Sequence, residues 1–348
     1  MKILTLLPVD SQPRFIKRIN LLKDEHEVTV AYQQRDYFKK NSIPDGCKKV
    51  ILGKVENKKY HKRIFKIFNY YSKIKSLNEK FDVIYAFSFD LLIISMFFNC
   101  KFRIYEIGDL RRVNLKIFDV LNKYLLSKQD QIIVTSYKFG QYLNEKYDVQ
   151  LSKIKVLENK LEHKSFKDIT PGLIKSSNKI RIGIIGLLRY QQIVDLLDAV
   201  AQSPEKFEIH IYGAGTLLNR ILPFIDNKTF FYYGEFKYPN DLEAIYANID
   251  FNFVMYDSTD LNVRLALPNK LYESIYFNVP IIVSSNTYLS EKVLEYGVGI
   301  SWNIDNISKL PGNLVELVST TKYQELIDSC KKLDRENIFL NEADYSIL

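Results

Sequence analysis

Short apolar runs alternate with segments of helical period along most of the chain, and this alternation requires an α/β fold. Near the start, an apolar run at residues 2–7 and another at 27–32 flank a segment whose apolar residues recur with helical spacing from Pro13 onward. A strand, a helix and a second strand in this order form a βαβ unit with parallel strands. The alternation begins again at residue 180. The sequence therefore predicts two doubly wound, Rossmann-like domains.

The domain limits follow from composition. Residues 1–170 form the first predicted domain, and the polar stretch 171–179 is the predicted linker. Residues 180–320 form the second domain. We expect residues 321–348 to be a C-terminal helical segment that crosses back to the first domain. With 348 residues, the chain is long enough for each domain to bury a core of its own.

Charge is divided unequally between the two halves. Residues 1–170 carry 33 Lys and Arg against 19 Asp and Glu, a net charge of +14, whereas residues 171–348 carry 16 against 22, a net charge of −6. Such asymmetry indicates that the first half faces an acidic surface, either nucleic acid or anionic lipid. The alternative is the lysine-rich habit of an AT-rich genome, which would spread over both halves. Because no known nucleic-acid-binding module surrounds the basic residues, we expect no nucleic-acid partner.

The most basic window of the chain is residues 48–80, which hold 11 Lys and Arg and only two acidic residues. From Lys58 onward, apolar and aromatic residues recur at helical spacing, and cations occupy the remaining positions. These cations include Lys59, Lys62, Arg63, Lys66 and Lys73. Two interpretations are open at this point. The helix lies on a membrane interface with anionic headgroups, or it packs its apolar face on the sheet and leaves its lysines in water.

Other patterns limit the cofactors and the compartment. The longest apolar run, Leu91–Phe98, is too short to span a bilayer, and the N-terminal run meets charge too early for a secretory signal. The three cysteines are widely spaced, and no Asp-x-Asp pair offers itself to a divalent metal. Gly213-Ala-Gly215 begins like a dinucleotide fingerprint, but Leu218 stands where the third glycine would be. We therefore expect no metal or other cofactor, and a cytoplasmic protein that is soluble or peripheral at the inner face of the plasma membrane.

The stretch 264–284 is the clearest candidate for a binding site. Pro268 suits a helix entry, the segment Asn278-Val-Pro closes a helix of about ten residues, and an apolar strand follows. Arg264, Lys270 and Glu273 lie within or just before the first turns, where backbone donors are unpaired. Two cations at a helix start suit a phosphate or diphosphate, and a carboxylate one turn further on can accept hydrogen bonds from sugar hydroxyls. A surface helix with ordinary charges is the alternative.

The order of elements in the second half resembles the nucleotide-sugar-binding domain of GT-B glycosyltransferases, specifically the large retaining family four. The likeness extends over nearly the whole chain and is strongest over residues 180–300. The matching segments are Gly186-Leu-Leu-Arg189-Tyr190, Tyr212-Gly213-Ala-Gly215, Gly234-Glu235-Phe236, Tyr246 with Asp250, Leu267-Pro268-Asn269-Lys270-Leu-Tyr272-Glu273 and Pro280-Ile-Ile-Val. The Pro-Asn-Lys-x-Tyr-Glu pattern is similar to that of a subgroup of capsule and lipopolysaccharide biosynthesis enzymes.

This resemblance implies a donor site in a cleft between the two domains. Arg189 and Lys270 would meet the donor diphosphate, where fixed cations stabilise the charge that develops on the leaving phosphate, and Glu273 would accept from ribose hydroxyls. These three are the implied catalytic residues. The implied donor-binding residues are Gly186, Arg189, Tyr190, Gly213, Gly215, Phe236, Asn269, Lys270 and Glu273. On the acceptor side we expect Arg14, Glu106 and Asp109, which lie at or after the carboxyl ends of predicted strands.

The implied function is a hexosyltransferase that moves a sugar from UDP or GDP to a lipid-linked or polysaccharide acceptor, with retention, in bacterial surface polysaccharide synthesis. The chain departs from the family's paired-glutamate motif, because Leu265 occupies the position eight residues before Glu273. Two alternatives follow. One is a nucleotide-sugar 2-epimerase of similar architecture, against which the presence of only four histidines argues. The other is a degenerate, non-catalytic protein that binds nucleotide sugar, which Leu265 makes plausible.

Overall fold

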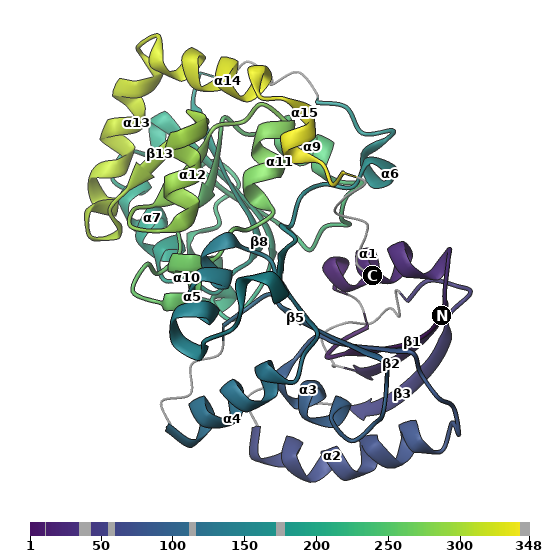
Figure 1. The fold of residues 1–348 in the computed structure, drawn as a ribbon. Coiled ribbons are helices and arrows are strands. Elements are labelled where there is room, and N and C mark those ends of the chain that lie inside the picture. The colour runs from purple at the N-terminus through teal and green to yellow at the C-terminus, as the bar shows by residue number, and fades with distance from the viewer. Residues whose placement is uncertain (11, 35–42, 55–59, 111–115, 172–177, 342–348) are drawn as a thin grey trace. The chain divides into compact units, whose positions relative to one another are not determined.

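A computed structural model describes the chain except for residues 11, 35–42, 55–59, 111–115, 172–177 and 342–348, and it leaves the side chains of residues 13, 60–65 and 116 undescribed. The chain divides into two compact units, Met1–Glu158 and Asn159–Leu348. Each unit has its own parallel sheet with helices (Figure 1). The predicted α/β class with two Rossmann-like units is therefore confirmed. Most of the predicted linker lies outside the described residues, and the predicted domain limits stay predictions.

The first unit is built on a seven-stranded sheet in the order β3-β2-β1-β4-β5-β6-β7. Every neighbouring pair is parallel. The strands are β1 (Lys2–Leu7), β2 (Glu27–Gln34), β3 (Lys48–Lys54), β4 (Val83–Ala86), β5 (Phe102–Ile107), β6 (Gln131–Val134) and β7 (Ile154–Val156). Both faces of such a sheet must be covered, which explains why β1 and β4 are almost entirely apolar.

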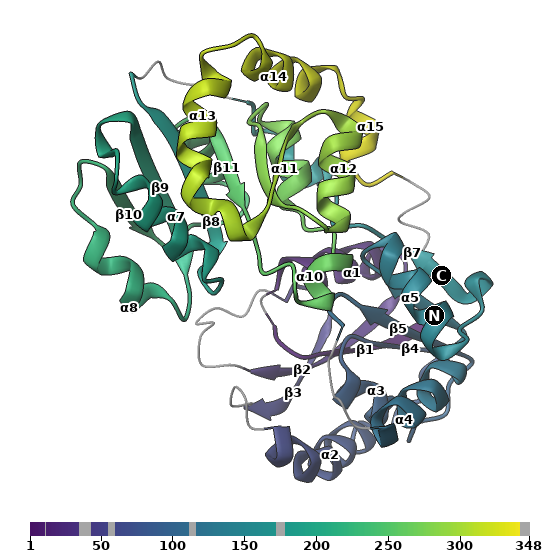
Figure 2. The ribbon, with the colours of Figure 1, turned by 90° about the vertical axis from the view of Figure 1, so that its left-hand side faces the viewer.

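Helices cover the two faces of this first sheet. They are α1 (Pro13–Lys23), α2 (Tyr60–Lys75), α3 (Phe89–Ser95), α4 (Lys116–Ser127) and α5 (Tyr137–Tyr147), with a short 3₁₀ helix η1 (Leu151–Lys153). In both ribbon views α2, α3 and α4 lie together on one side of the sheet and α1 lies on the other (Figures 1 and 2). The right-handed crossovers between β3 and β6 account for this common side.

The described part of α2 packs against the sheet. Tyr70 and Ile74 are buried, and Lys66 and Lys73 donate to backbone carbonyls of β3 at 2.6–3.1 Å. These ammonium groups thus bond the backbone of β3, an edge strand of the sheet. The contacts favour the packed-helix interpretation for this part of α2. The predicted cations Lys59, Lys62 and Arg63 have side chains outside the described residues.

The second unit contains a six-stranded sheet in the order β10-β9-β8-β11-β12-β13, again parallel throughout. The strands are β8 (Ile180–Leu187), β9 (Phe207–Ala214), β10 (Phe230–Gly234), β11 (Phe251–Val254), β12 (Ile281–Ser284) and β13 (Gly299–Trp302). The chain leaves β8 in one direction for β9 and β10, and then returns to the other side of β8 as β11. The topological switch point therefore lies between β8 and β11, and ligands of such sheets bind at the carboxyl ends of these strands.

Two clusters of buried apolar residues, one on each face, form the core of the second unit. The helices are α6 (His163–Phe166), α7 (Gln192–Val200), α8 (Leu218–Ile221), α9 (Leu242–Tyr246), α10 (Leu261–Leu265), α11 (Lys270–Tyr276), α12 (Tyr288–Tyr296), α13 (Leu310–Val318), α14 (Lys322–Lys332) and α15 (Arg335–Ile338), with 3₁₀ helices η2 (Pro204–Lys206), η3 (Leu222–Phe224) and η4 (Ile304–Lys309). Both α14 and α15 pack on α11. The crossing of the C-terminal segment to the first unit stays a prediction.

The central helix α11 is shorter than its sequence predicts. It has 7 residues, whereas about ten were expected from the spacing of Pro268 and Asn278. Asn278 adopts the left-handed conformation, with φ at +58°, and this ends the helix before Val279. All seven residues of α11 are buried, including the charged residues Lys270 and Glu273. A helix that buries charge in this way needs internal partners for it.

Candidate active site

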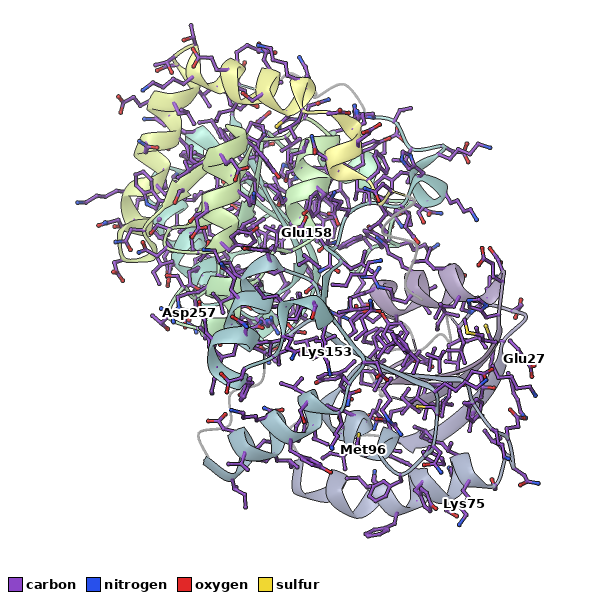
Figure 3. All side chains as sticks on the ribbon, in the orientation of Figure 1. Glu27, Lys75, Met96, Lys153, Glu158 and Asp257 are labelled. Atoms are coloured by element: carbon purple, nitrogen blue, oxygen red, sulfur yellow. The ribbon has the colours of Figure 1, made fainter. Side chains whose placement is uncertain are left out.

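Aromatic side chains meet at the switch point of the second sheet. Tyr190 follows β8 and Tyr256 follows β11, and their rings stack with centroids 4.4 Å apart. The guanidinium of Arg189 lies over the Tyr190 ring, with its Cζ 4.8 Å from the ring centre, and Nη2 donates to the Tyr190 hydroxyl at 2.6 Å. Arg189 itself is exposed. Asp257, the residue after Tyr256, is labelled in Figure 3 and lies just beyond the carboxyl end of β11. An anion arriving here would meet a cation already held in place by an aromatic ring.

Three glycines fix the backbone beside this point. Gly186 and Gly213 face each other across β8 and β9, and a Cβ on Gly213 would lie 1.8 Å from the carbonyl oxygen of Gly186. A Cβ on Gly215 would lie 2.1 Å from the carbonyl oxygen of Leu188. These two glycines therefore let neighbouring backbone segments approach each other closely, and their predicted contacts with the donor stay predictions. A Cβ on Gly186 would lie 3.8 Å from Cε of Lys270, so the end of β8 borders the Lys270 side chain.

Glu273 is the centre of a buried polar network. Nζ of Lys270 lies 2.6 Å from Oε2 of Glu273, and the Tyr246 hydroxyl donates to the same oxygen at 3.0 Å. Nδ2 of Asn269 donates to Oε1 at 2.5 Å. Glu273 has no exposed surface and Lys270 is 7% exposed. Each charge thus compensates the other, as burial of either one requires.

A second layer of polar groups supports this network from β11. Nδ2 of Asn252 donates to the Tyr246 hydroxyl at 3.1 Å and to the Ser274 hydroxyl at 2.8 Å. Burial raises the pKa of Tyr246 well above its ordinary value, and the neighbouring Glu273 carboxylate raises it further. The Tyr246 hydroxyl therefore stays protonated and remains a donor. Tyr246 of α9 and Asn269 and Lys270 at the start of α11 therefore hold Glu273 in one position, and Asn252 of β11 holds Tyr246 in turn.

The Tyr256 hydroxyl interacts electrostatically with both Arg189 and Glu273. Burial has the largest effect on its pKa and raises it, the Arg189 guanidinium lowers it, and the Glu273 carboxylate raises it. Phe236, which follows β10, has its ring centre 5.7 Å from Nζ of Lys270. The structure thus gathers Gly186, Phe236, Asn269, Lys270 and Glu273 in one cluster, and places Arg189 on Tyr190 beside Tyr256.

The sequence interpretation missed three residues of this region, namely Tyr246 as a partner of Glu273, Asn252 and Tyr256. Asn252 lies in a segment that reads as ordinary core, and the resemblance that includes Tyr246 gives it no partner. Tyr256 carries a usable signal, since it directly follows the apolar run at residues 251–255 and so falls at a carboxyl strand end.

In the first unit, Glu106 of β5 belongs to a buried ion cluster. Oε2 accepts from Nε of Arg18 at 3.1 Å and from the Tyr85 hydroxyl, and Oε1 lies 3.4 Å from Nε of Arg14. Glu106 is 1% exposed. The cluster ties α1 to β5, so in this conformation Glu106 stabilises the fold, and its predicted acceptor contact stays a prediction.

The other acceptor-side residues are placed differently. The Arg14 guanidinium covers Gly108, where a Cβ would lie 1.2 Å from Nη1, which explains the glycine after β5. Asp109 is exposed at the end of the same strand. Over the described ranges, no group of three or more His, Cys, Asp and Glu side chains could hold a metal ion.

No protein family and no curated protein matches this chain by sequence. Solved structures do match. Sucrose-phosphate synthase from Thermosynechococcus elongatus superimposes with a TM-score of 0.75 at 13% identity, over 99% of this chain and 96% of that one. Anabaena HepE in complex with UDP-glucose matches with a TM-score of 0.68 at 14% identity, over 94% and 93%. WaaG, a glycosyltransferase involved in lipopolysaccharide biosynthesis, matches with a TM-score of 0.69 at 12% identity, over 97% of each chain.

These likenesses extend over whole chains and agree with the two parallel sheets. The fold is therefore that of the GT-B glycosyltransferases, as the sequence resemblance implied. No helix in the described part of the chain has the length and apolar character needed to cross a bilayer.

Proposed function

We propose that this chain is a glycosyltransferase that moves a sugar from a UDP or GDP donor to a lipid-linked or polysaccharide acceptor. The observation that carries the proposal is the buried Lys270–Glu273 pair at the carboxyl end of β8, with exposed Arg189 at the neighbouring switch point. HepE binds UDP-glucose with the same fold, and WaaG belongs to lipopolysaccharide biosynthesis. The first likeness favours a nucleotide sugar as donor, and the second favours a surface polysaccharide as product.

Arg189 and Lys270 would act on the leaving group. When the bond between the sugar C1 and the phosphate oxygen breaks, negative charge accumulates on the diphosphate and positive charge on the sugar ring. Fixed cations stabilise this separated state more than the ground state, and they need no metal to do so. Stacking on Tyr190 limits the positions of the Arg189 side chain before the donor arrives.

Glu273 would bind the ribose once Lys270 turns to the diphosphate. In the structure its two oxygens accept from three donors, Asn269, Lys270 and Tyr246. A carboxylate offers about four acceptor positions, so the departure of Lys270 would leave room for two ribose hydroxyls. Tyr246 and Asn269 would meanwhile keep the carboxylate in place. On donor binding, Lys270 would thus exchange Glu273 for the diphosphate, and Glu273 would exchange Lys270 for the ribose hydroxyls.

The transfer would proceed with retention. The acceptor oxygen would form its bond to C1 on the face that the phosphate leaves, and the acceptor proton would pass to a phosphate oxygen. This route asks no side chain to act as a base, and Asp109 would help to orient the acceptor hydroxyl. The excess of cations in residues 1–170 favours an acceptor at the anionic inner face of the plasma membrane.

A second candidate is a non-catalytic protein that binds nucleotide sugar, which Leu265 favours because it removes a carboxylate expected near the donor sugar. Transfer and binding measured together separate the two. The purified chain is incubated with a panel of radiolabelled UDP- and GDP-sugars and bacterial membranes. Label in the lipid and polysaccharide fractions and free sugar are counted, and nucleotide binding is measured by calorimetric titration. Label in the lipid or polysaccharide fraction supports the transferase. Nucleotide binding without transfer or hydrolysis supports the non-catalytic binder.

A further inference from the structure

The helix α4 carries its apolar residues on the outside. Ile117, Val120, Leu121 and Tyr124 are 75%, 69%, 37% and 55% exposed. Their spacing of three, one and three residues places them on one face of the helix. We call these four residues the α4 apolar face. A surface helix of a globular protein normally turns such a stripe toward the core, so its exposure needs an explanation.

The opposite side of α4 holds the helix in place with polar contacts. Oδ1 of Asp119 accepts from the Tyr147 hydroxyl at 2.9 Å and pairs with Nζ of Lys146 at 3.0 Å. Nδ2 of Asn122 lies 3.4 Å from the Tyr147 hydroxyl. These partners belong to α5, and Leu125 and Leu126 are buried on the same side. The helix is therefore anchored in this orientation, and turning it to bury the apolar face would break these bonds.

Neighbouring helices extend the apolar surface. Phe68 of α2 is 77% exposed, and Phe97, two residues beyond the end of α3, is 57% exposed. Its neighbour in the chain, Met96, is labelled in Figure 3. Both helices lie with α4 on one side of the sheet in the two ribbon views (Figures 1 and 2). Six large apolar side chains are thus exposed along three consecutive helices that share one side of the sheet. A flat, extended partner suits this spread better than a single peptide does.

Charge indicates what the partner is. The only acidic residue of α4, Asp119, is turned to α5 and is neutralised there by Lys146. Lys128 lies one turn beyond Tyr124, is exposed, and has its Nζ 5.3 Å from the Tyr124 ring centre. Lys123 is also exposed, although it pairs with Asp148. Apolar side chains with cations beside them, in a half of the chain with net charge +14, match an anionic bilayer surface.

We propose that the α4 apolar face inserts into the boundary between headgroups and acyl chains of an anionic membrane, with Lys128 meeting lipid phosphates. The proposed function includes association with a membrane, and the structure places the contact on α4 rather than on α2, where the sequence pattern suggested it. In the described part of α2, Lys66 and Lys73 are bound to the edge strand of the sheet. The proposal rests on the proposed function only in that a lipid-linked acceptor would give the docking a purpose.

Vesicle flotation tests the proposal with the full chain. Vesicles of phosphatidylcholine with 30% phosphatidylglycerol, chosen as the probe, are compared with pure phosphatidylcholine. We expect binding to the anionic vesicles, weakened by salt, and a loss of about tenfold or more in Ile117→Asp/Val120→Asp. The matched control is Leu151→Asp/Leu294→Asp, which changes two residues of 61% exposure elsewhere and should bind as the parent does.

Two results would overturn the proposal. One is equal vesicle binding by the α4 variant and the parent. The other is no binding of the parent to either vesicle, and a parent dimer in light scattering that the α4 variant loses would then assign the face to an interface between copies of this chain. Circular dichroism and UDP titration of the α4 variant check that its fold and its second unit are intact. Vesicle binding without any nucleotide affinity would refute the proposed function and leave the docking surface standing.

Discussion

Nζ of Lys270 lies 2.6 Å from Oε2 of Glu273, one turn further along α11, and the pair is buried inside the second unit. Lys270 is therefore both a candidate diphosphate ligand and the counter-ion of a carboxylate that has no exposed surface. Removing one member of such a pair leaves an uncompensated buried charge. Loss of function at Lys270 thus has two possible causes, which experiments must separate.

A double-mutant cycle separates these causes. Lys270→Ala should lower the free energy of unfolding by about 3 kcal/mol, because the buried Glu273 charge loses its partner. Lys270→Ala/Glu273→Gln should recover most of this stability, since the remaining amide carries no charge. Urea unfolding of the parent, both single variants and the double variant measures the coupling. If the double variant is no more stable than Lys270→Ala, the pair is not the counter-ion system seen in the structure.

Arg189 offers a cleaner test of catalysis because its side chain is exposed. Arg189→Ala should change the free energy of unfolding by less than about 0.5 kcal/mol, yet lower the transfer rate by about 100-fold or more. Lys331→Ala in α14, where the side chain is 55% exposed, is the matched loss of a surface cation and should keep the parent rate. A parent-like rate in Arg189→Ala would remove this residue from the diphosphate site.

The pKa of Tyr246 predicts a dependence of stability on alkaline pH. Burial raises this pKa from its ordinary value of 10.0, with a further contribution from Glu273. Above pH 10 the unfolded chain releases the phenol proton while the folded chain retains it, so stability falls as the pH rises. Tyr246→Phe should make this fall shallower, at a cost of about 1 kcal/mol near neutral pH from the lost hydrogen bond to Glu273. The free energy of unfolding of the parent and of Tyr246→Phe, measured between pH 8 and about pH 11, would show this difference. If both fall with pH at the same slope, the raised pKa of Tyr246 is contradicted.

The proposed mechanism assigns the leaving-group charge to side chains, so chelation should have little effect. Transfer measured with EDTA in excess over total divalent metal should retain the rate measured without it. Restoration of a lost rate by added Mg²⁺ or Mn²⁺ would show instead that a metal ion meets the donor diphosphate.

Much of the architecture could be predicted because short apolar runs mark parallel strands directly. The helix of α11 was predicted too long, since the left-handed conformation of Asn278 is not visible in its spacing from Pro268. The hydrogen bond from Tyr246 to Glu273, and the support that Asn252 gives to Tyr246, were missed for a different reason. Tyr246 and Asn252 precede Glu273 by 27 and 21 residues, and only the return of the chain to β11 beside β8 brings them under α11.

The helix α4, which we propose binds the membrane, illustrates a second limit of the sequence. A basic amphipathic pattern pointed to α2, but periodicity does not reveal which face of a helix is covered. In α4 the apolar residues are distributed so widely around the helix that either of two faces could pack against the core. The contacts of Asp119 and Asn122 with α5 decide the outcome, and these are long-range interactions.

Calorimetric titration with UDP, GDP and their sugars shows whether Arg189 and Lys270 hold a nucleoside diphosphate, on which the proposed function depends. We expect saturable binding of at least one of these compounds to the parent, about tenfold or more weaker in Arg189→Ala, with the Lys331→Ala control unchanged. No heat of binding with any uridine or guanosine compound, or equal affinity in the parent and in Arg189→Ala, would contradict it.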